Sequence, residues 1–439
     1  MVMSEINIKK YKDALGHLNL IKYSGRVSKV IGLTIESEGP AVELGEVCDI
    51  FPLKSDVPIK AEVVGFKGEI VFLMPLGEMT GIGPGSKVVA TGHAFHVDVG
   101  ENLLGRVLDG LGHPIDGFSK PVTNKKYPAD NNPPNPLMRD RITEPLPLGV
   151  KAIDGLITCG RGQRIGIFAG SGVGKSTLMG MIAKNTTADV NVIALVGERG
   201  REVREFIENE LGEEGLRKSV LIVATSDKPA LVRVKAAMLA TSVAEYFRDM
   251  GKNVVLMMDS LTRFSMAQRE IGLAVGEPPV TRGYTPSVFA VLPRLLERAG
   301  NSDLGSITGL YTVLVDGDDF NEPISDAVRG ILDGHILLSR RLAHLGHYPA
   351  IDILGSVSRV MPQIVESEHL EASRRFKEIM ATYSEAEDLI NIGAYAKGTN
   401  PKIDEAIERY PEYMKYLSQG MHENSTYKES VDLLKNISE

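Results

Sequence analysis

RIGIFAGSGVGKSTLMGMIAK, residues 164–184, is the stretch that decides the fold of the central part of this chain. An apolar run, RIGIFA, leads into a glycine-rich bend, and LMGMIAK continues as a helical run. Glycines at 170, 172 and 174 let backbone N–H groups converge on an anion, and a helix start adds unpaired donors and a favourable dipole. A strand, a glycine-rich bend and a helix in this order are typical of a phosphate-binding loop.

The loop AGSGVGKST, residues 169–177, supplies the candidate nucleotide-binding residues. They are Ala169, Gly170, Ser171, Gly172, Val173, Gly174, Lys175, Ser176 and Thr177. Lys175 would reach the β- and γ-phosphates of a nucleoside triphosphate, and the Ser176 hydroxyl would bind Mg²⁺. Ala169 stands where the usual pattern has glycine, and this small residue at the end of a strand is tolerated. The alternative is a chance glycine-rich turn.

Apolar runs alternate with helical segments on both sides of this loop. The strand candidates are RIGIFA (164–169), VNVIALV (190–196), VLIVAT (220–225), NVVLMM (253–258) and GLYTVLV (309–315). A long helix is expected after Pro229, and Gly251 would end it. Continuous apolar strands that alternate with helices predict an α/β fold with a parallel sheet covered on both faces.

Charged residues follow two of these strands. Asp259 comes after NVVLMM, and ligands bind at the carboxyl ends of strands in such sheets, so we expect Asp259 to hold Mg²⁺. The alternative is an Asp that starts a turn or caps the next helix. Glu198 follows VNVIALV and would orient or polarise the attacking water. Arg199 could neutralise charge on the γ-phosphate, whereas a surface Glu–Arg cluster is the plainer interpretation of both residues.

Two residues farther along the chain are also candidates. Arg359 lies in SVSRV, residues 356–360, among small and apolar residues. A buried guanidinium there would be costly unless it meets an anion, and the phosphate bound by a neighbouring subunit would supply one, as for an arginine finger. The alternative is an ion pair within the chain. Tyr348, in GHYPAID, suits stacking on adenine, or it is an ordinary half-buried tyrosine.

The segments around this core differ from it in pattern. Residues 22–95 contain short β runs broken by Gly and Pro, which predict a small β-barrel. Residues 96–149 form a connecting segment, proline-rich in its second half, that leads into a core over 150–362. Residues 363–439 read as a helical C-terminal domain. Residues 1–21 form a basic amphipathic segment that either packs on its own domain or docks on a partner or an anionic membrane surface.

Composition excludes several classes of protein. The 439 residues carry 49 basic and 57 acidic side chains, a net charge of -8, and no tryptophan. A nucleic-acid-binding protein usually has a basic excess, so no nucleic-acid partner is expected. Cys48 and Cys159 are too few for a disulfide framework, which favours a reducing cytoplasm. We find no secretory signal and no apolar run of about 18 residues that would span a membrane.

Longer motifs show a family resemblance. Residues 150–360 resemble the catalytic subunits of the rotary ATPases through the loop above and through GER, MMDSLTRF, GYTPSVF, GSIT, HYPAID and SVSRV. NPLMRDRITEPLPLGVKAIDGLITCGRGQ and GEPPVTRGYTPSVFAVLPRLLERAG are similar to the flagellar and type III protein-export ATPases. The barrel stretches GRVSKVIGLTIES and GPAVELGEVCDI favour the flagellar members, with the ATPase of a virulence injectisome as the alternative.

This resemblance implies a RecA-like ATPase core and a homohexamer with sites between subunits, which hydrolyses ATP with Mg²⁺ to energise protein export. By position, Lys175, Ser176 and Asp259 match the phosphate and Mg²⁺ residues, and Glu198 matches the catalytic glutamate. Arg199 matches the neighbouring arginine, Arg359 the finger and Tyr348 the adenine-stacking residue. Arg263 matches an arginine near the site.

The resemblance also implies partners and a location. The loop EPPVTRGY, residues 277–284, matches the region that faces a central coiled-coil stalk. The N-terminal segment matches the part used for oligomer contacts and for a regulator that resembles a peripheral stalk. The export gate, export substrates and their chaperones are further expected partners, at the cytoplasmic base of the flagellum. A silent nucleotide-binding subunit and an RNA translocase are the competing functions.

Overall fold

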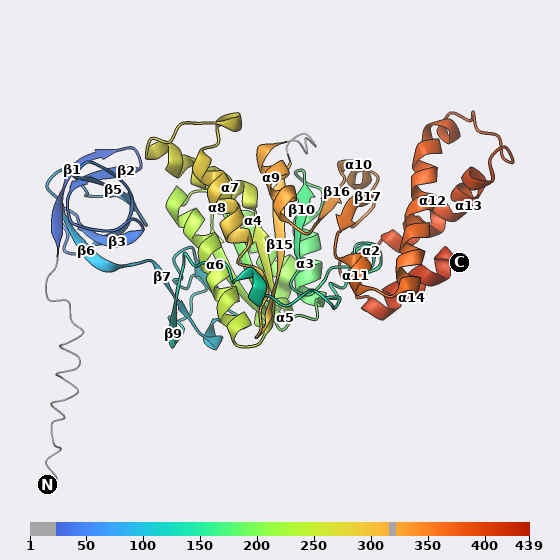
Figure 1. Ribbon diagram of the computed structural model, residues 1–439, viewed down its shortest axis with the longest axis horizontal. Coiled ribbons are helices and arrows are strands. Elements are labelled where there is room, and N and C mark those ends of the chain that lie inside the picture. The colour runs from blue at the N-terminus through green and yellow to red at the C-terminus, as the bar shows by residue number, and fades with distance from the viewer. Residues whose placement is uncertain (1–22, 316–321) are drawn as a thin grey trace, which may run out of the picture. The chain divides into compact units, whose positions relative to one another are not determined.

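The computed structural model describes residues 23–315 and 322–439, and its chain divides into two compact units, one that ends at Phe95 and one that begins at His96 (Figure 1). The expected amphipathic segment, residues 1–21, lies outside the described residues.

The first unit is a closed antiparallel barrel, as predicted. Its strands are β1 (Ser24–Ile31), β2 (Thr34–Glu38), β3 (Glu46–Phe51), β4 (Ile59–Lys67), β5 (Ile70–Pro75) and β6 (Lys87–Ala94). They pair in the order β1-β2-β5-β4-β3-β6. Alternate side chains point inward, because successive residues of a strand face opposite sides. Val27, Ile35, Ile50 and Leu73 thus fill the interior, and closure leaves no exposed edge.

A sheet of nine strands forms the centre of the second unit. Its path is β17-β16-β10-β15-β13-β11-β12-β8, with β14 paired to β15. The strands are β8 (Val107–Asp109), β10 (Arg164–Ala169), β11 (Val190–Val196), β12 (Ser219–Ala224), β13 (Asn253–Asp259), β14 (Gly300–Asn301), β15 (Ser306–Leu314), β16 (Gly334–Leu338) and β17 (Ile351–Ser358). All pairs are parallel except β16–β17 and β14–β15. The parallel sheet is therefore confirmed, with an antiparallel strand at one edge.

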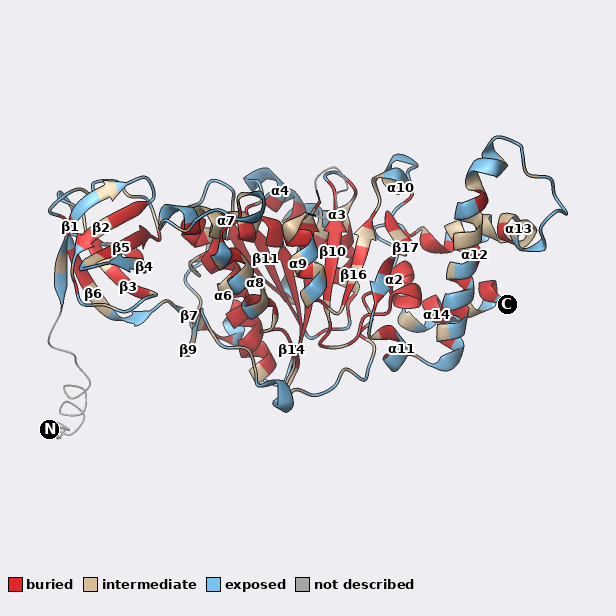
Figure 2. Cartoon of the chain, turned by 45° about the horizontal axis from the view of Figure 1, so that its top comes forward, coloured by how far each residue is buried: buried red, intermediate tan, exposed pale blue. Residues whose placement is uncertain are grey.

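Helices cover both faces of this sheet. They are α2 (Lys151–Leu156), α3 (Lys175–Asn185), α4 (Gly200–Glu205), α5 (Gly212–Arg217), α6 (Ala230–Asp249), α7 (Leu261–Ala274), α8 (Pro286–Leu296), α9 (Pro323–Ile331), α10 (Arg340–His344) and α11 (Met361–Ile364), with the short turns η1 (Glu101–Leu103), η2 (Pro136–Met138), η3 (Phe206–Leu211) and η4 (Thr281–Gly283). Figure 2 shows the buried strands of the sheet between these layers. The long helix expected after Pro229 is α6.

The expected connecting segment is more ordered than a linker. Its strands β7 (His96–Val99) and β9 (Lys125–Pro128) pair with each other, and β8 extends the central sheet by pairing with β12. Farther along, Arg298 donates to the carbonyl of Ala129 and forms a two-pronged ion pair with Glu245 of α6, 2.8 Å long and buried. The crossing chain is thereby tied to the helical layer.

The C-terminal helices share a hydrophobic core with the sheet. These helices are α12 (Ser367–Asn391), α13 (Pro401–Leu417) and α14 (Tyr427–Ser438). Phe376 stacks on Tyr413 with ring centroids 4.0 Å apart, and both rings belong to the same apolar cluster as Leu178 of α3 and Ile193 of β11. A helical C-terminal part is confirmed, and it is packed onto the core. None of the described helices combines the length and apolar character needed to cross a membrane.

Candidate nucleotide-binding site

The glycine-rich loop joins the end of β10 to the start of α3. Gly172 and Gly174 have φ angles of 75° and 87°, in the left-handed region that glycine enters without steric cost. Between them, Val173 is buried and anchors the loop to the core. Gly174 directly precedes the first turn of α3. The N–H groups of that turn lack partners within the helix, so they can bind an anion.

Lys175 extends from this turn to two carboxylates. Its Nζ forms an ion pair with Asp259 Oδ1 and lies 3.6 Å from Glu198 Oε1. Asp259 is the last residue of β13, and Glu198 follows β11 after one glycine. Because β10, β11 and β13 are parallel, their carboxyl ends meet at one edge of the sheet. The structure thus brings together three residues that lie up to 84 positions apart in sequence.

Asp259 is buried at the end of its strand and does not occupy the cap position of the next helix. It is 3 % exposed and accepts a hydrogen bond of 2.7 Å from the Thr312 hydroxyl on β15. The cap of α7 is instead Ser260, whose side chain accepts from the N–H of Arg263. The interpretation of Asp259 as a capping residue is therefore wrong.

Burial sets the protonation of Glu198. Loss of water, followed by repulsion from Asp259, raises the pKa of Glu198 to about 7, while the Lys175 amine opposes the shift. An ordinary glutamate is fully ionised at neutral pH. A carboxyl group that titrates near neutrality can instead accept a proton with little cost, which suits a general base.

Tyr348 lies beside the glycine-rich loop although the two are far apart in the sequence, because β17, which follows Tyr348, begins level with the end of β10. It follows α10, and its ring atoms Cδ1 and Cε1 are both 3.4 Å from the point where a side chain at Gly174 would begin. The ring is half exposed, at 46 % for the residue. An exposed ring next to the loop suits stacking on a base.

Two predicted residues do not join this cluster. The Arg199 side chain is 79 % exposed and reaches Glu202 at 3.4 Å instead of Lys175. Arg199 occupies the N-cap position of α4, and its side chain makes no capping hydrogen bond. Thr177 donates a hydrogen bond of 3.0 Å to Glu210. The surface-cluster interpretation therefore fits Arg199 within one chain, but not Glu198.

Arg263 lies against the bend that carries Glu198. The first carbons of its side chain are 2.7 and 3.0 Å from the point where a side chain at Gly197 would begin. Its Nε is buried and makes no hydrogen bond within the described residues. Only glycine fits at position 197, because its φ angle is 75° and Arg263 packs closely against it.

Arg359 is exposed, and the expectation that it is buried in a strand is wrong. It follows the last residue of β17, an edge strand, and its N–H bonds to the carbonyl of Asp333. Its guanidinium contacts the carbonyl of Arg329 at 3.5 Å and forms no ion pair within the described ranges. Among the described residues, no carboxylate therefore pairs with Arg359.

Arg359 also lies at the opposite end of the strands from the glycine-rich loop, which follows the carboxyl end of β10. Ser358 of β17 pairs with Gly334 of β16. The next residue of β16, His335, pairs with Gly166 of β10. Arg359 is therefore level with the beginning of β10, about five residues before the loop. At about 3.3 Å per residue the separation is about 16 Å. Within one chain, the backbone of Arg359 is therefore well separated from the loop that carries Lys175.

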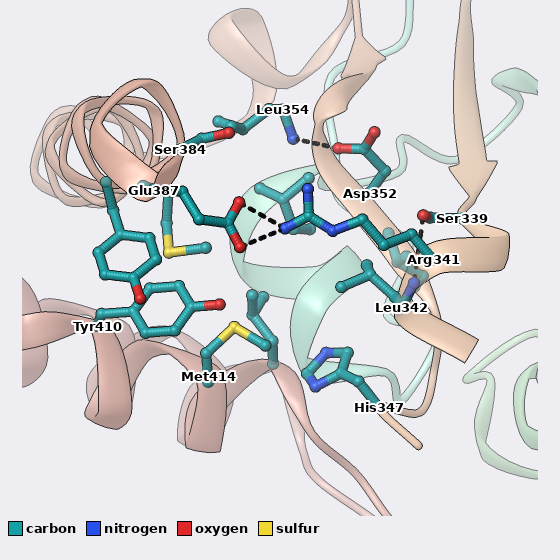
Figure 3. A pocket seen from close by; sticks show the side chains of 15 residues that line it. Ser339, Arg341, Leu342, His347, Asp352, Leu354, Ser384, Glu387, Tyr410 and Met414 are labelled. Atoms are coloured by element: carbon teal, nitrogen blue, oxygen red, sulfur yellow. Dashed lines mark hydrogen bonds and ion pairs between the residues drawn. The ribbon is translucent and has the colours of Figure 1, made fainter. Parts of the chain in front are cut away.

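A separate pocket lies where the sheet edge meets the C-terminal helices (Figure 3). Its volume is 310 Å³, and Met380, Tyr410 and Met414 contribute to its wall. Arg341 of α10 reaches across to both carboxylate oxygens of Glu387 at 2.7 and 2.6 Å. No residue of the glycine-rich loop lines this pocket, so the pocket is distinct from the cluster around Lys175.

A metal at the cluster would depend on the nucleotide. The described residues contain no group of three His, Cys, Asp or Glu side chains that could hold an ion. Mg²⁺ commonly takes one or two protein oxygens together with substrate phosphates. The exposed Ser176 hydroxyl and the buried Asp259 carboxylate fit that requirement.

Two contributors were not predicted from sequence. Thr312 is a polar residue inside the apolar run GLYTVLV, and that position was the available signal. Glu210 lies in a charged helical stretch that resembles any solvated surface, and no spacing connects it to Thr177. Such a contact between segments depends on their packing.

The domain matches agree with this architecture. The ATP synthase alpha/beta family matches twice, through its nucleotide-binding domain at residues 149–358 and its beta-barrel domain at residues 27–92. The T3SS EscN ATPase C-terminal domain matches residues 365–436. The flagellum-specific ATP synthase of Bacillus subtilis is 58% identical over 97% of both chains. The chain belongs to the flagellar and type III secretion ATPases. It is thus an ATPase of the ATP synthase alpha/beta family.

Other members of this family are similar over nearly the whole chain. The flagellum-specific ATP synthase of Salmonella typhimurium is 49% identical over 97% of this chain and 96% of its own length. The type 3 secretion system ATPase of Xanthomonas euvesicatoria is 51% identical over 94% of each chain. The assembled ATPase EscN of enteropathogenic E. coli superposes with a TM-score of 0.89 at 47% identity, over 94% of this chain and 100% of its own.

Proposed function

We propose that the chain hydrolyses ATP at the interfaces of a homohexamer and so energises protein export by the flagellar type III secretion apparatus. The observation that carries this proposal is the arrangement of charged groups. Lys175 lies with Asp259 and Glu198 at one end of the strands, whereas the exposed Arg359 lies at the other. This separation supports a site that a second chain completes.

The residues of the cluster divide the chemistry among them. Loop amides and the Lys175 amine hold the triphosphate, and the Lys175 amine neutralises charge on the transferred group. Glu198 orients the attacking water and accepts its proton, for which a pKa of about 7 is suited. Ser176 and Asp259 would hold Mg²⁺, which supplies charge neutralisation at the β- and γ-phosphates.

The remaining groups complete the site. Tyr348 stacks on the adenine, since its ring lies beside Gly174. Arg359 of an adjacent subunit reaches the γ-phosphate as an arginine finger, a role worth about 10³ to 10⁵ in rate in other phosphoryl-transfer enzymes. We assign no catalytic role to Arg199 within its own chain, because its side chain points to solvent.

The parts of the chain take different tasks in this proposal. Residues 150–362 form the ATPase domain, residues 22–95 the barrel and residues 363–439 the helical domain, with residues 96–149 between barrel and core. The loop 277–284 faces a central stalk, which is supported by the solved complex of EscN with its central stalk EscO. Residues 1–21 bind a peripheral-stalk-like regulator or a membrane surface at the cytoplasmic base of the flagellum.

ATP turnover as a function of protein concentration tests the proposal. Sites shared between chains require specific activity to rise steeply with concentration, and Lys175→Ala and Glu198→Gln should each abolish turnover. Full turnover by either variant would refute the assignment of the site. The alternative, an ATPase of a virulence injectisome, is decided by whether flagellar or secretion-needle genes lie beside this gene.

A further inference from the structure

The chain between β11 and β12 forms an arm that begins at Glu198 and returns to helix α3. Within it, α4 leads directly into η3, which is a π-helical turn, and Gly212, with a φ angle of 62°, marks the break between η3 and α5. A π turn has one more residue in its hydrogen-bonded loop than an α turn, and such turns are frequent at functional sites. The arm thus combines the proposed catalytic glutamate with an unusual turn.

The wider turn places apolar residues of the arm against α3. Phe206 and Leu211 begin and end η3, and they are 4 % and 0 % exposed. Both belong to the cluster that contains Leu178 and Met181 of α3. Residues five positions apart face different sides of an α-helix, whereas a π turn brings them toward the same side. Glu210, next to Leu211, is thereby also brought to α3.

Glu210 contacts α3 directly behind the glycine-rich loop. Its Oε1 accepts a hydrogen bond of 3.0 Å from the Thr177 hydroxyl, in the first turn of α3. A side chain at Gly180 would begin 2.7 Å from Glu210 Cβ and 2.9 Å from its carbonyl oxygen. Position 180 must therefore be glycine for the arm to approach so closely. Glu210 forms no ion pair within the described residues, so the Thr177 hydroxyl is its side-chain partner there.

We propose that Glu210 is a positioning residue that fixes the Glu198 arm to the helix bearing the phosphate loop. This inference rests on the proposed function of Glu198. Thr177 follows Ser176 and Lys175, the residues assigned to the metal and the phosphates. The hydrogen bond therefore connects the two halves of the site, and it holds the attacking water's base at a constant distance from the loop.

The geometry separates this role from nucleotide binding. Glu210 touches no loop amide, so its loss leaves the anion-binding groups intact. Misplacement of a catalytic group by about 1 Å can lower the rate by about 100-fold. Loss of the Thr177–Glu210 bond is thus expected to lower kcat by about 10-fold or more while nucleotide affinity is kept.

Four variants test the inference in the full-length protein. Glu210→Ala removes the acceptor, Thr177→Val removes the donor with the same shape, and the double variant removes both. Glu210→Gln keeps an oxygen acceptor and should retain most of the turnover. Glu208→Ala is the matched control, because Glu208 lies on the outer side of the same turn and pairs with Arg204 at 2.7 Å.

The measurements are kcat at a concentration where wild-type activity has reached its plateau, the Kd of a fluorescent ATP analogue, and the melting temperature. We expect reduced kcat with unchanged Kd in both single variants, and no further loss in the double variant, because one bond is removed in each case. Losses that multiply in the double variant, or a weakened Kd that accounts for them, would overturn the inference.

Failure of this inference is distinguishable from failure of the proposed function. If Glu198→Gln is inactive while Thr177→Val and Glu210→Ala turn over like wild type, the arm needs no such anchor and only this inference fails. If Glu198→Gln keeps full turnover, the assignment of the base itself fails.

Discussion

Mixing two inactive variants tests whether Arg359 completes the site of another chain. Lys175→Ala removes the amine of the phosphate loop. Arg359→Ala removes the guanidinium of a residue whose backbone lies at the other end of the strands, about 16 Å from the start of that loop along the strand direction. Each variant alone should lose about 10³-fold or more in turnover. In a ring assembled at random from equal amounts, about a quarter of the interfaces combine an intact loop with an intact Arg359 from the next chain. Turnover should therefore return to about a quarter of the wild-type value.

The assay is phosphate release at constant total protein, above the concentration where wild-type activity reaches its plateau. The ratio of the two variants is changed from one extreme to the other, and activity should be greatest at equal amounts and fall to the background at both ends. Chemical cross-linking of differently tagged chains controls for co-assembly. Mixed rings without any recovery of activity would refute a site shared between chains, since every such ring contains intact interfaces.

Three further predictions follow from single groups. The pKa of Glu198 in the free enzyme is about 7, and Glu198 must be ionised to act as a base. For ATP with excess Mg²⁺, kcat/KM should therefore rise about tenfold from pH 6 to pH 8. A value of kcat/KM that stays constant down to pH 5 would contradict the raised pKa of this group. Tyr348→Ala should raise KM for ATP while kcat is retained. Tyr348→Phe should behave like wild type, because stacking on adenine needs the ring and not the hydroxyl. Arg298→Ala leaves the buried Glu245 carboxylate without its ion-pair partner, so urea unfolding should show a loss of stability of about 3 to 5 kcal/mol. The exposed Arg201→Ala is the control and should lose far less stability. Equal losses in the two variants would show that burial is not the cause.

Much of the central fold is readable from the sequence because its strands are buried on both faces. RIGIFA and VNVIALV coincide with β10 and β11, since each apolar run is bounded by polar or turn residues. The strand predicted for GLYTVLV begins three residues earlier in the structure, because β15 starts at Ser306, which pairs with Asn253 of β13. The strand β8 was not predicted, because a three-residue strand in a segment rich in turns has no periodicity to detect.

The candidate site was predictable where chemistry and strand ends coincide. Asp259 and Glu198 follow buried strands, and parallel pairing alone brings them to Lys175. The exposure of Arg359 was not predictable, because spacing within SVSRV does not show whether a strand lies at an edge. The partner of Thr177 was equally hidden, because it depends on how a π turn directs Glu210 toward another helix.

The apolar cluster that runs from the central sheet into the C-terminal helices has a practical consequence. A chain truncated after residue 362 would leave the surface that meets Phe376, Tyr413 and Leu434 open to water. Such a shortened protein would tend to aggregate through that surface. The C-terminal helices are therefore part of the same folding unit as the central sheet, and a minimal soluble fragment would have to retain them.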